Sequence, residues 1–417
     1  AVDHNQLTME IMKKVADKHD LVCLLHEKPF EGINGSGKHN NWSMITDDGV
    51  NLLDPGKTPS ENIQFLVFLM AVIKAVDEYA DLLRISVASA GNDHRLGANE
   101  APPAVVSIFL GDELTEVLKS IENDTYFTSH GAVQMDIGAT VLPHFVKDNT
   151  DRNRTSPFAF TGNKFEFRML GSAASVANPN IVLNTAVAEA LDQFAKELDG
   201  VAPEDMEHAV HELIKRAIKK HKRVIFNGNG YTDEWIEEAE KRGLYNLIST
   251  PDALPMWIAK KNIDLFTKHS IYTSEEIHSR YEIWLENYSK TINIESNTMV
   301  EMVQKDLLPS VMSYIEEIAS TASLKASVVP GITCESETAL ITKLSGLQDA
   351  MTKGLEKLKA DTAKAKATDD VLENAKLYQA EVLEDMEELR KSADEAETLI
   401  PDDLLPYPTY GKLLFYI

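Results

Sequence analysis

An apolar seam in the last third of the chain restricts its fold more than any other sequence feature. Its members recur four, three, four, four and three positions apart, as in a helix that packs along a coiled-coil-like stripe; they are Leu340, Leu344, Leu347, Met351, Leu355 and Leu358. A second apolar set follows, made of Val371, Ala375, Tyr378, Val382, Met386 and Leu389. Because residues 368–370 interrupt the pattern, we predict a helical hairpin with a structural or assembly role.

Upstream of the seam, helical and strand-like patterns alternate. Apolar spacing predicts a helix over 4–18 with Asp3 as its N-cap, and another over 61–83 with Ser60 at its cap. Residues 203–300 read as mostly helical. Short apolar or alternating runs predict strands, and these cover residues 21–25, 42–46, 85–91, 104–111 and 163–170. The chain therefore combines strands with many helices.

Overall composition limits the classes of partner. The 417 residues carry a net charge of −25, which disfavours general affinity for nucleic acid or anionic membranes, since both attract Lys and Arg. The most apolar stretch, 65–76, is too short to span a bilayer. The two cysteines, Cys23 and Cys334, give no disulfide framework, so a cytoplasmic location is expected. The start at Ala1 shows no signal peptide, and we interpret it as a cut end.

A glycine-rich loop over 32–38 satisfies most of the Walker A phosphate-binding pattern. Two features argue against that function: His39 stands where a magnesium-binding hydroxyl is required, and 40–43 reads as a strand rather than a helix. What remains is a tight turn that presents small polar side chains together, namely Asn34, Ser36, His39, Asn41 and Ser43. Taken alone, the loop is also compatible with a surface turn, and His39 with an ordinary hydrogen-bonded histidine.

A strand with two unlike faces is expected over 163–170. Alternation places aromatic and apolar side chains on one face, and Lys164, Glu166 and Arg168 on the other. The charged face is either a solvated sheet surface or the floor of a polar site. Arginines in the loops at 94–103 and 151–157 of an otherwise acidic chain favour anion binding nearby.

Taken together and in order, three segments within residues 26–168 resemble glutamine synthetase. They are the loop KPFEGINGSGKHNNWS, the loop RLGANEAP and the segment NRTSPFAFTGNKFEFR. The flap-like loop, the acidic helical C-terminal region and the ending PYPTYGKLLF resemble the type III branch of that family. No single one of these motifs is specific for the family, but the three in this order and at this spacing are.

The resemblance implies an α+β fold, with an antiparallel sheet backed by helices and a mostly helical C-terminal extension. Four segments are expected, and we predict them as a catalytic sheet domain over 1–175, a helical continuation over 176–335, the hairpin over 336–398 and a tail over 399–417. The family forms large rings of subunits, so the resemblance also implies a homo-oligomer, a dodecamer by analogy.

Site roles follow from the resemblance one position at a time. His39 and Glu166 would be metal ligands, and an imidazole with a carboxylate suits magnesium or manganese. Asn34 and Gly35 would hold the amino-acid end of glutamate.

The resemblance also implies roles for four charged residues in substrate binding and in the reaction. Arg95 and Arg168 would bind the substrate carboxylates. Arg154 would contact the transferring phosphate and stabilise its charge. Glu100 would lie on a flap that keeps water from the acyl phosphate, and would help to take a proton from ammonium.

The nucleotide contacts depart from the family pattern. Asn41, Ser43, Arg154 and Lys164 would lie along ATP. However, the family often has histidine where Asn41 stands and usually has arginine where Lys164 stands, so a bidentate fork becomes a single ammonium. It also expects an arginine at the position of Ala159.

The function implied is ATP-dependent formation of glutamine from glutamate and ammonia through γ-glutamyl phosphate. Two alternatives stay open: a γ-glutamyl-amine ligase of the same fold, and a non-catalytic assembly or regulatory module. Further metal ligands of the family lie upstream of a helix like 4–18, so we expect this chain alone to be weakly active or inactive. The whole interpretation requires His39 and Glu166 to converge on one cation, with Arg154 and Arg168 lining the same cavity.

Overall fold

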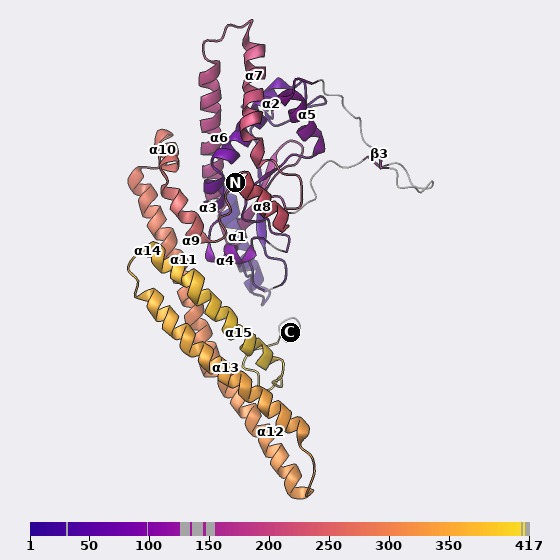
Figure 1. Cartoon of the computed structure of the whole chain (residues 1–417), viewed down its shortest axis with the longest axis vertical. Helices are drawn as coiled ribbons and strands as arrows, with labels where there is room; N and C mark the ends of the chain where they lie inside the picture. Colours follow the sequence, from indigo (N-terminus) through magenta and orange to yellow (C-terminus); the bar gives the residue numbers. More distant parts are fainter. Residues whose placement is uncertain are drawn as a thin grey trace. The chain divides into compact units, whose positions relative to one another are not determined.

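The computed structural model describes most of the chain in two compact units (Figure 1). Residues 1–30, 32–97, 99–125, 155–409 and 412 are described with their side chains, and 134–135 and 145–146 by their backbone. The units comprise residues 1–281 and 282–417, and their boundary falls inside one long helix. The four finer segments expected from the sequence stay a prediction.

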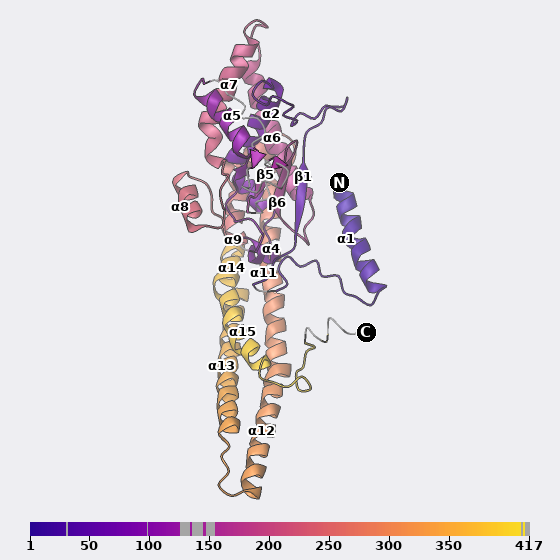
Figure 2. The same cartoon turned by 90° about the vertical axis from the view of Figure 1, so that its right-hand side faces the viewer.

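The first unit combines a small sheet with helices (Figure 2). Its strands are β1 (Gly37–Trp42), β2 (Ile108–Phe109), β3 (Gln134–Met135), β4 (Phe145–Val146), β5 (Phe158–Phe160) and β6 (Phe165–Gly171). Its longer helices are α1 (Val2–Asp17), α2 (Ile63–Glu78), α5 (Asp112–Glu122), α6 (Ala177–Leu198), α7 (Met206–His221), α8 (Asp233–Lys241), α10 (Lys260–Lys268) and the start of α11 (Ser274–Met302). Its short helices are α3 (Ala80–Ile85), α4 (Ala90–Arg95), η1 (Lys222–Val224), α9 (Thr250–Ala253) and η2 (Leu254–Ile258).

Four of the strands form one mixed sheet in the order β1-β6-β5-β2. β6 pairs antiparallel with both β1 and β5, whereas β2 pairs parallel with β5. The α+β prediction is confirmed, but the sheet is mixed rather than wholly antiparallel. Aromatic side chains anchor its apolar face: Phe158 stacks on Phe165 with ring centroids 4.6 Å apart, and Phe160 meets Phe65 of α2.

Helices α2, α6 and α7 pack on one another beside the sheet (Figure 2). From Leu69 to Asp77 every residue of α2 is buried, which explains why most residues of this stretch are apolar. Two side chains from elsewhere satisfy the buried carboxylate of Asp77: His221 Nδ1 lies 2.8 Å from one oxygen, and Arg223 Nε lies 2.7 Å from the other.

Three strand predictions were wrong or only partly right. Residues 21–25 form no strand, and their apolar side chains lie largely exposed instead of packing in a sheet. Residues 85–91 close one short helix and open another, because the Ser89 side chain accepts a hydrogen bond from Asn92 N and caps α4. Within 104–111 only Ile108 and Phe109 form a strand.

The strand predicted over 42–46 instead begins inside the glycine-rich loop. β1 runs from Gly37 to Trp42, and beyond it only an isolated bridge joins Ile45 to Asn51. The alternating pattern was therefore placed too late in the chain. The strand over 163–170 is confirmed as β6.

Two helix boundaries also differ from expectation. The helix expected over 61–83 breaks at Tyr79 into α2 and α3, and its cap is Asn62 rather than Ser60, since the Asn62 side chain accepts from Phe65 N. The first helix begins at Val2, so Asp3 lies in its first turn and is not its N-cap. Mostly helical structure over 203–300 is confirmed.

The second unit is helical throughout its regular structure. It contains the rest of α11, the π-helical turns η3 (Val303–Leu307) and η4 (Tyr378–Val382), and α12 (Leu308–Val328), α13 (Glu335–Lys366), α14 (Val371–Leu377) and α15 (Leu383–Glu397). Helix α13 packs against both α12 and α15 (Figure 1). The seam is buried at Leu344, Leu347, Met351, Leu355 and Leu358, which confirms the predicted helices. Across the part of the chain with described structure, the longer helices carry too many polar residues for any to cross a bilayer.

Candidate active site

The paired strands β1 and β6 separate a packed face from a polar face. On the packed face, Asn40 Nδ2 donates to Asn180 Oδ1 of α6 at 2.8 Å, and Trp42 Nε1 donates to Asn184 Oδ1 at 2.8 Å. On the other face Asn41 lies opposite Glu166. Alternation along β1 then places His39 beside Asn41, on the side of the sheet that carries Glu166.

A β-bulge brings His39 to Glu166. The pairs Lys38–Leu170 and Asn40–Phe167 leave one residue on β1 opposite two on β6. His39 therefore faces both Arg168 and Met169. A bulge re-aims side chains and leaves part of the ladder unpaired, so the position of His39 depends on what holds the bulge.

The side chains of His39, Glu166 and Arg168 meet above this bulge. His39 Nδ1 lies 2.9 Å from Glu166 Oε1, although the two residues are 127 positions apart. Arg168 donates from Nε at 2.9 Å and from Nη2 at 2.7 Å to Glu166 Oε2. The Glu166 carboxylate is thus shared between an imidazole and a guanidinium, and His39 and Glu166 lie close together, as the predicted metal site requires.

The pKa of Glu166 reports the same arrangement. Burial acts to raise the pKa, but the hydrogen bonds and positive charge of Arg168, together with His39, outweigh it and hold the pKa below the usual value. The carboxylate is therefore ionised and oriented at neutral pH. An ionised carboxylate beside an imidazole is a suitable start for a magnesium or manganese site.

The Arg95 side chain fills the space beneath the glycine-rich loop. It is 4% exposed, and a Cβ atom at Gly37 would lie well inside van der Waals contact of its guanidinium. A Cβ atom at Gly35 would lie 2.8 Å from Arg95 Cγ. Side chains at these two positions would therefore displace Arg95 or lift the loop.

Arg95 is also the hydrogen-bond partner of the bulge. It donates to Arg168 O at 3.1 Å and to Met169 O at 3.2 Å, the carbonyls of the two residues that face His39. Asn92 Nδ2 adds a bond to Met169 O at 2.9 Å. Burial lowers the pKa of Arg95, while the negative charge of Glu27 acts to raise it.

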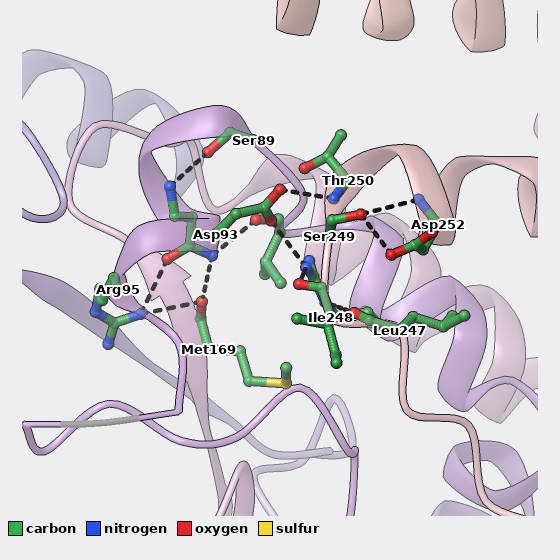
Figure 3. A network of polar contacts seen from close by, with 12 residues as sticks. Ser89, Asp93, Arg95, Met169, Leu247, Ile248, Ser249, Thr250 and Asp252 are labelled. Atoms are coloured by element: carbon green, nitrogen blue, oxygen red, sulfur yellow. Dashed lines mark hydrogen bonds and ion pairs between the residues drawn. The ribbon is translucent and has the colours of Figure 1, made fainter. Parts of the chain in front are cut away.

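Helix α4 extends this network to the helical part of the unit (Figure 3). Asp93 accepts from Arg84 Nη2 at 2.8 Å and from Thr250 N at 2.6 Å. Arg84 in turn donates to the carbonyls of Leu247 and Ile248, each at 2.8 Å. The short helix thus braces β6 on one side and the chain before α9 on the other.

The remaining predicted site residues lie around this centre with fewer contacts. Asn34 is exposed in the loop and Gly35 is partly covered. Ser43 Oγ donates to Asn51 Oδ1 at 2.7 Å, just beyond β1. Asn41 donates to His39 O at 3.4 Å, and Lys164 lies one residue before β6, half-buried.

Glu100 lies on a loop with an uncommon backbone. Its φ angle is 68° and that of Asn99 is 51°, in the left-handed region that residues other than glycine seldom adopt. The carboxylate is exposed, and its charge contributes, after burial, to a raised pKa of Tyr231. Arg154 lies outside the described residues, so its expected place in the cavity is not tested.

The contacts of Lys38 differ from those of a Walker A lysine, which binds phosphate. Its ammonium donates to Ala174 O at 2.9 Å and to Ser172 O, in the turn that follows β6. Since β1 continues through this residue, no helix N-terminus follows the loop. The structure thus agrees with rejection of a P-loop, and the sequence contained no signal for these carbonyl contacts.

Among the described residues, no group of three or more His, Cys, Asp and Glu side chains is arranged to hold a metal ion. The contact between His39 and Glu166 brings together only two such side chains. A separate cavity of about 440 Å³ lies between α5 and α7. None of the predicted site residues lines it, so it is distinct from this centre.

Comparison with known proteins identifies two matching sequence families. The family described as "Glutamine synthetase, catalytic domain" matches residues 1–106, and "Glutamine synthetase C-terminal domain" matches residues 209–325. The first match includes the glycine-rich loop, β1 and α4. The second covers the helices from within α7 to within α12.

Curated relatives align with the whole chain. A "Glutamine synthetase" of Butyrivibrio fibrisolvens is 57% identical over 420 residues, which is all of this chain and 59% of that protein. A "Type-3 glutamine synthetase" of Dictyostelium discoideum is 46% identical and is covered to 57% of its length. A "Glutamine synthetase" of Bacteroides fragilis (strain YCH46) is 37% identical and is covered to 58%. The chain thus spans less than two thirds of each relative.

Proposed function

The chain belongs to the glutamine synthetase family, and on this premise we propose that it carries part of the active site of a glutamate–ammonia ligase. The reaction would be ATP-dependent and would join ammonia to the γ-carboxylate of glutamate. The single observation that supports this most is the contact between His39 Nδ1 and Glu166 Oε1 at 2.9 Å, with Arg168 on the other carboxylate oxygen.

The reaction needs an activated carboxylate, because a free carboxylate is a poor electrophile. An oxygen of the glutamate γ-carboxylate attacks the γ-phosphorus of ATP, and ADP leaves. Ammonia then attacks the acyl carbon, phosphate leaves, and the surplus proton of the incoming amine passes to a base. Water must be excluded throughout, since it would hydrolyse the acyl phosphate.

His39 and Glu166 would hold a magnesium or manganese ion. When bound, that ion neutralises phosphate oxygens during transfer. Glu166 suits this task because Arg168 fixes one of its oxygens and thereby orients the other toward His39. The remaining ligands would have to come from residues beyond this pair.

Charged residues around this centre take the other roles. Arg168 would bind a substrate carboxylate. Arg95 is proposed for the same substrate, which requires it to release the carbonyls it now holds. Arg154 would stabilise the transferring phosphate, and Asn41, Ser43 and Lys164 would lie along the nucleotide.

The loop glycines and the flap complete the proposal. The backbone at Asn34 and Gly35 would hold the amino-acid end of glutamate. Glu100, exposed on its strained loop, would cover the acyl phosphate and accept the proton. By family analogy the protein would be a cytoplasmic homo-oligomer, a ring of the dodecameric kind.

A second candidate is a ligase of the same fold that uses another amine. The same two ligands and arginines would serve it, since only the acceptor pocket differs. Comparing ammonia with methylamine and putrescine as acceptors separates the two, because a γ-glutamyl-amine ligase would favour the larger amines.

The test uses the whole protein that carries this chain and measures both manganese binding and glutamine formation. His39→Ala and Glu166→Gln should each weaken manganese binding at least about tenfold and abolish most activity. His208→Ala, which alters an exposed histidine of α7, is the matched control and should change neither. Unchanged manganese affinity in both site variants would refute the proposed metal site.

A further inference from the structure

We propose that Glu27 is a positioning residue that clamps the end of the β1–β6 ladder and so fixes the bulge that brings His39 to Glu166. The inference deepens the proposed function and rests on it for its catalytic consequence. Its structural part, the clamp itself, can be tested without any activity.

Glu27 connects the residue before β1 to the turn after β6. Its backbone carbonyl accepts from Ser36 N at 2.7 Å, and Ser36 immediately precedes β1. Its carboxylate oxygen Oε1 accepts from Ala173 N at 3.1 Å, two residues beyond β6. One residue thus holds both strands at the same end of the ladder.

That end determines the register of the bulge. The last paired residues there are Gly37 with Gly171, followed by Lys38 with Leu170, and the irregularity begins directly after Lys38. A slip by one residue would turn His39 toward the packed face, because side chains alternate along a strand. A clamp at Ser36 and Ala173 prevents the slip.

The glycines around Glu27 show that its side chain occupies a fitted space. A Cβ atom at Gly91 would lie 2.6 Å from Glu27 Oε2, and one at Gly171 would lie 2.7 Å from Oε1 and closer still to Cγ. Both distances are shorter than real Cβ contacts. Glu27 is itself 5% exposed, so its carboxylate is held by protein rather than by bulk water.

The negative charge of Glu27 also balances a cation of the clamp. Burial lowers the pKa of Arg95, and Glu27 gives the largest opposing contribution. Arg95 holds the bulge carbonyls and Lys38 holds the turn after β6. The carboxylate therefore offsets part of the cost of burying the guanidinium of Arg95, which a neutral group of equal size would not do.

Two substitutions of Glu27 separate the contributions of charge and side-chain length, and a third substitution elsewhere is the control. Glu27→Gln keeps the size and removes the charge. Glu27→Asp keeps the charge but shortens the reach to Ala173. Glu61→Gln, at an exposed carboxylate before α2, makes the same chemical change as the first substitution away from the clamp.

The first measurement is hydrogen exchange in the whole protein that carries this chain, on peptides covering 34–42 and 166–174. Both Glu27 variants should exchange these amides at least about threefold faster, whereas peptides of the seam over 340–358 should match wild type and report an intact fold. The second is manganese affinity, which should fall about tenfold in Glu27→Gln, as expected for a group that orients a ligand, and less in Glu27→Asp. Glu61→Gln should leave both readouts unchanged.

The outcomes separate the clamp from the ligase. If Glu27→Gln shows the hydrogen-exchange rates and the manganese affinity of the wild type, the inference is overturned. If Glu27→Gln does not fold, wild-type exchange rates in Glu27→Asp would overturn it. Faster exchange in a protein whose wild type binds no manganese would support the clamp and count against the proposed function alone. An equal loss of protection in the seam peptides would show general destabilisation and also overturn the inference.

Discussion

The candidate site of the first unit and the helical bundle of the second use charge in opposite ways. Around the site, charged side chains are buried: Arg84 is 1% exposed, and Arg95 and Arg168 are 4% and 5% exposed. In the second unit most ion pairs lie at the surface, as between Lys290 and Glu286, while an apolar seam fills the interior. One region is held by hydrogen bonds to specific atoms, and the other by apolar burial.

This difference teaches how each region tolerates change. Apolar burial is non-directional, so a bundle accepts many sequences that keep its pattern. A buried guanidinium needs its partners at defined positions, because an unpaired buried charge is costly. Even the buried carboxylate of the second unit, Asp385, lies 2.6 Å from Lys357. The site should therefore lose stability when partners are removed, and the bundle when volume is removed.

The largest effect is expected from breaking the buried pair between Arg84 and Asp93. Arg84→Met leaves the Asp93 carboxylate buried without its cation, which should cost about 3–5 kcal/mol in the free energy of unfolding. Urea unfolding followed by tryptophan fluorescence measures it, since three of the four tryptophans, Trp42, Trp235 and Trp257, lie in the first unit. The double variant Arg84→Met/Asp93→Asn should recover part of the loss; a cost below about 1 kcal/mol for the single change would contradict buried-charge control of this unit.

The bundle should respond next most strongly to lost volume in its seam. Leu344 is fully buried in α13, and Leu344→Ala should cost about 3 kcal/mol through lost apolar burial and a residual cavity. Hydrogen exchange of peptides over 335–366 measures the change. Leu340→Ala, at a half-buried position of the same stripe, is the control and should cost clearly less; equal losses would show that the seam does not carry the stability.

Glycine substitution should have opposite signs in the two units. Gly37→Ala forces a methyl group onto the Arg95 guanidinium and should destabilise the first unit by about 1–3 kcal/mol. A Cβ atom at Gly346 in α13 would meet no other atom within 4 Å outside the adjacent helix backbone, so Gly346→Ala should stabilise the helix by about 0.5–1 kcal/mol. Thermal unfolding of both variants checks this, and a shared sign would break the comparison.

A smaller effect should appear in acid. The pKa of Glu166 is below its usual value of 4.5 in the folded chain, since Arg168 and His39 outweigh burial. Its contribution to stability is therefore complete above that usual value and is lost as the pH falls through the folded-state pKa. Glu166→Gln should flatten the loss of stability below about pH 4.5. Denaturant titrations at several pH values test this, and an unchanged acid slope would show that the carboxylate is not stabilised in the folded state.

The smallest effect is expected at the bundle surface. The pair formed by Lys290 and Glu286 is one helical turn apart, and both side chains are at least half exposed. Lys290→Ala should change the free energy of unfolding by only about 0.3–0.5 kcal/mol, and less in high salt. Equilibrium unfolding at two salt concentrations measures it; a cost comparable to that of Arg84→Met would erase the contrast between the two regions.

The amino-acid sequence by itself determined the features that repeat or recur locally. The seam at 340–358 gave the helices of the second unit because helical periodicity is a property of neighbours in the chain. Alternation over 163–170 gave β6 and its two faces for the same reason. The order of the glycine-rich loop, the flap-like loop and the charged strand gave the family, and with it the pairing of His39 and Glu166.

Only the tertiary structure decided how those pieces meet. The bulge opposite His39, the burial of Arg95 and the role of Glu27 depend on contacts between residues far apart in the chain, which no local pattern encodes. The same holds for the break at Tyr79 and for the helices where a strand was expected over 85–91, since tertiary packing overrides local propensity. Periodicity predicts the type of an element, because it depends on residues that are close in the chain. The site forms where separate elements meet, so its geometry depends on contacts between residues that are far apart in the chain.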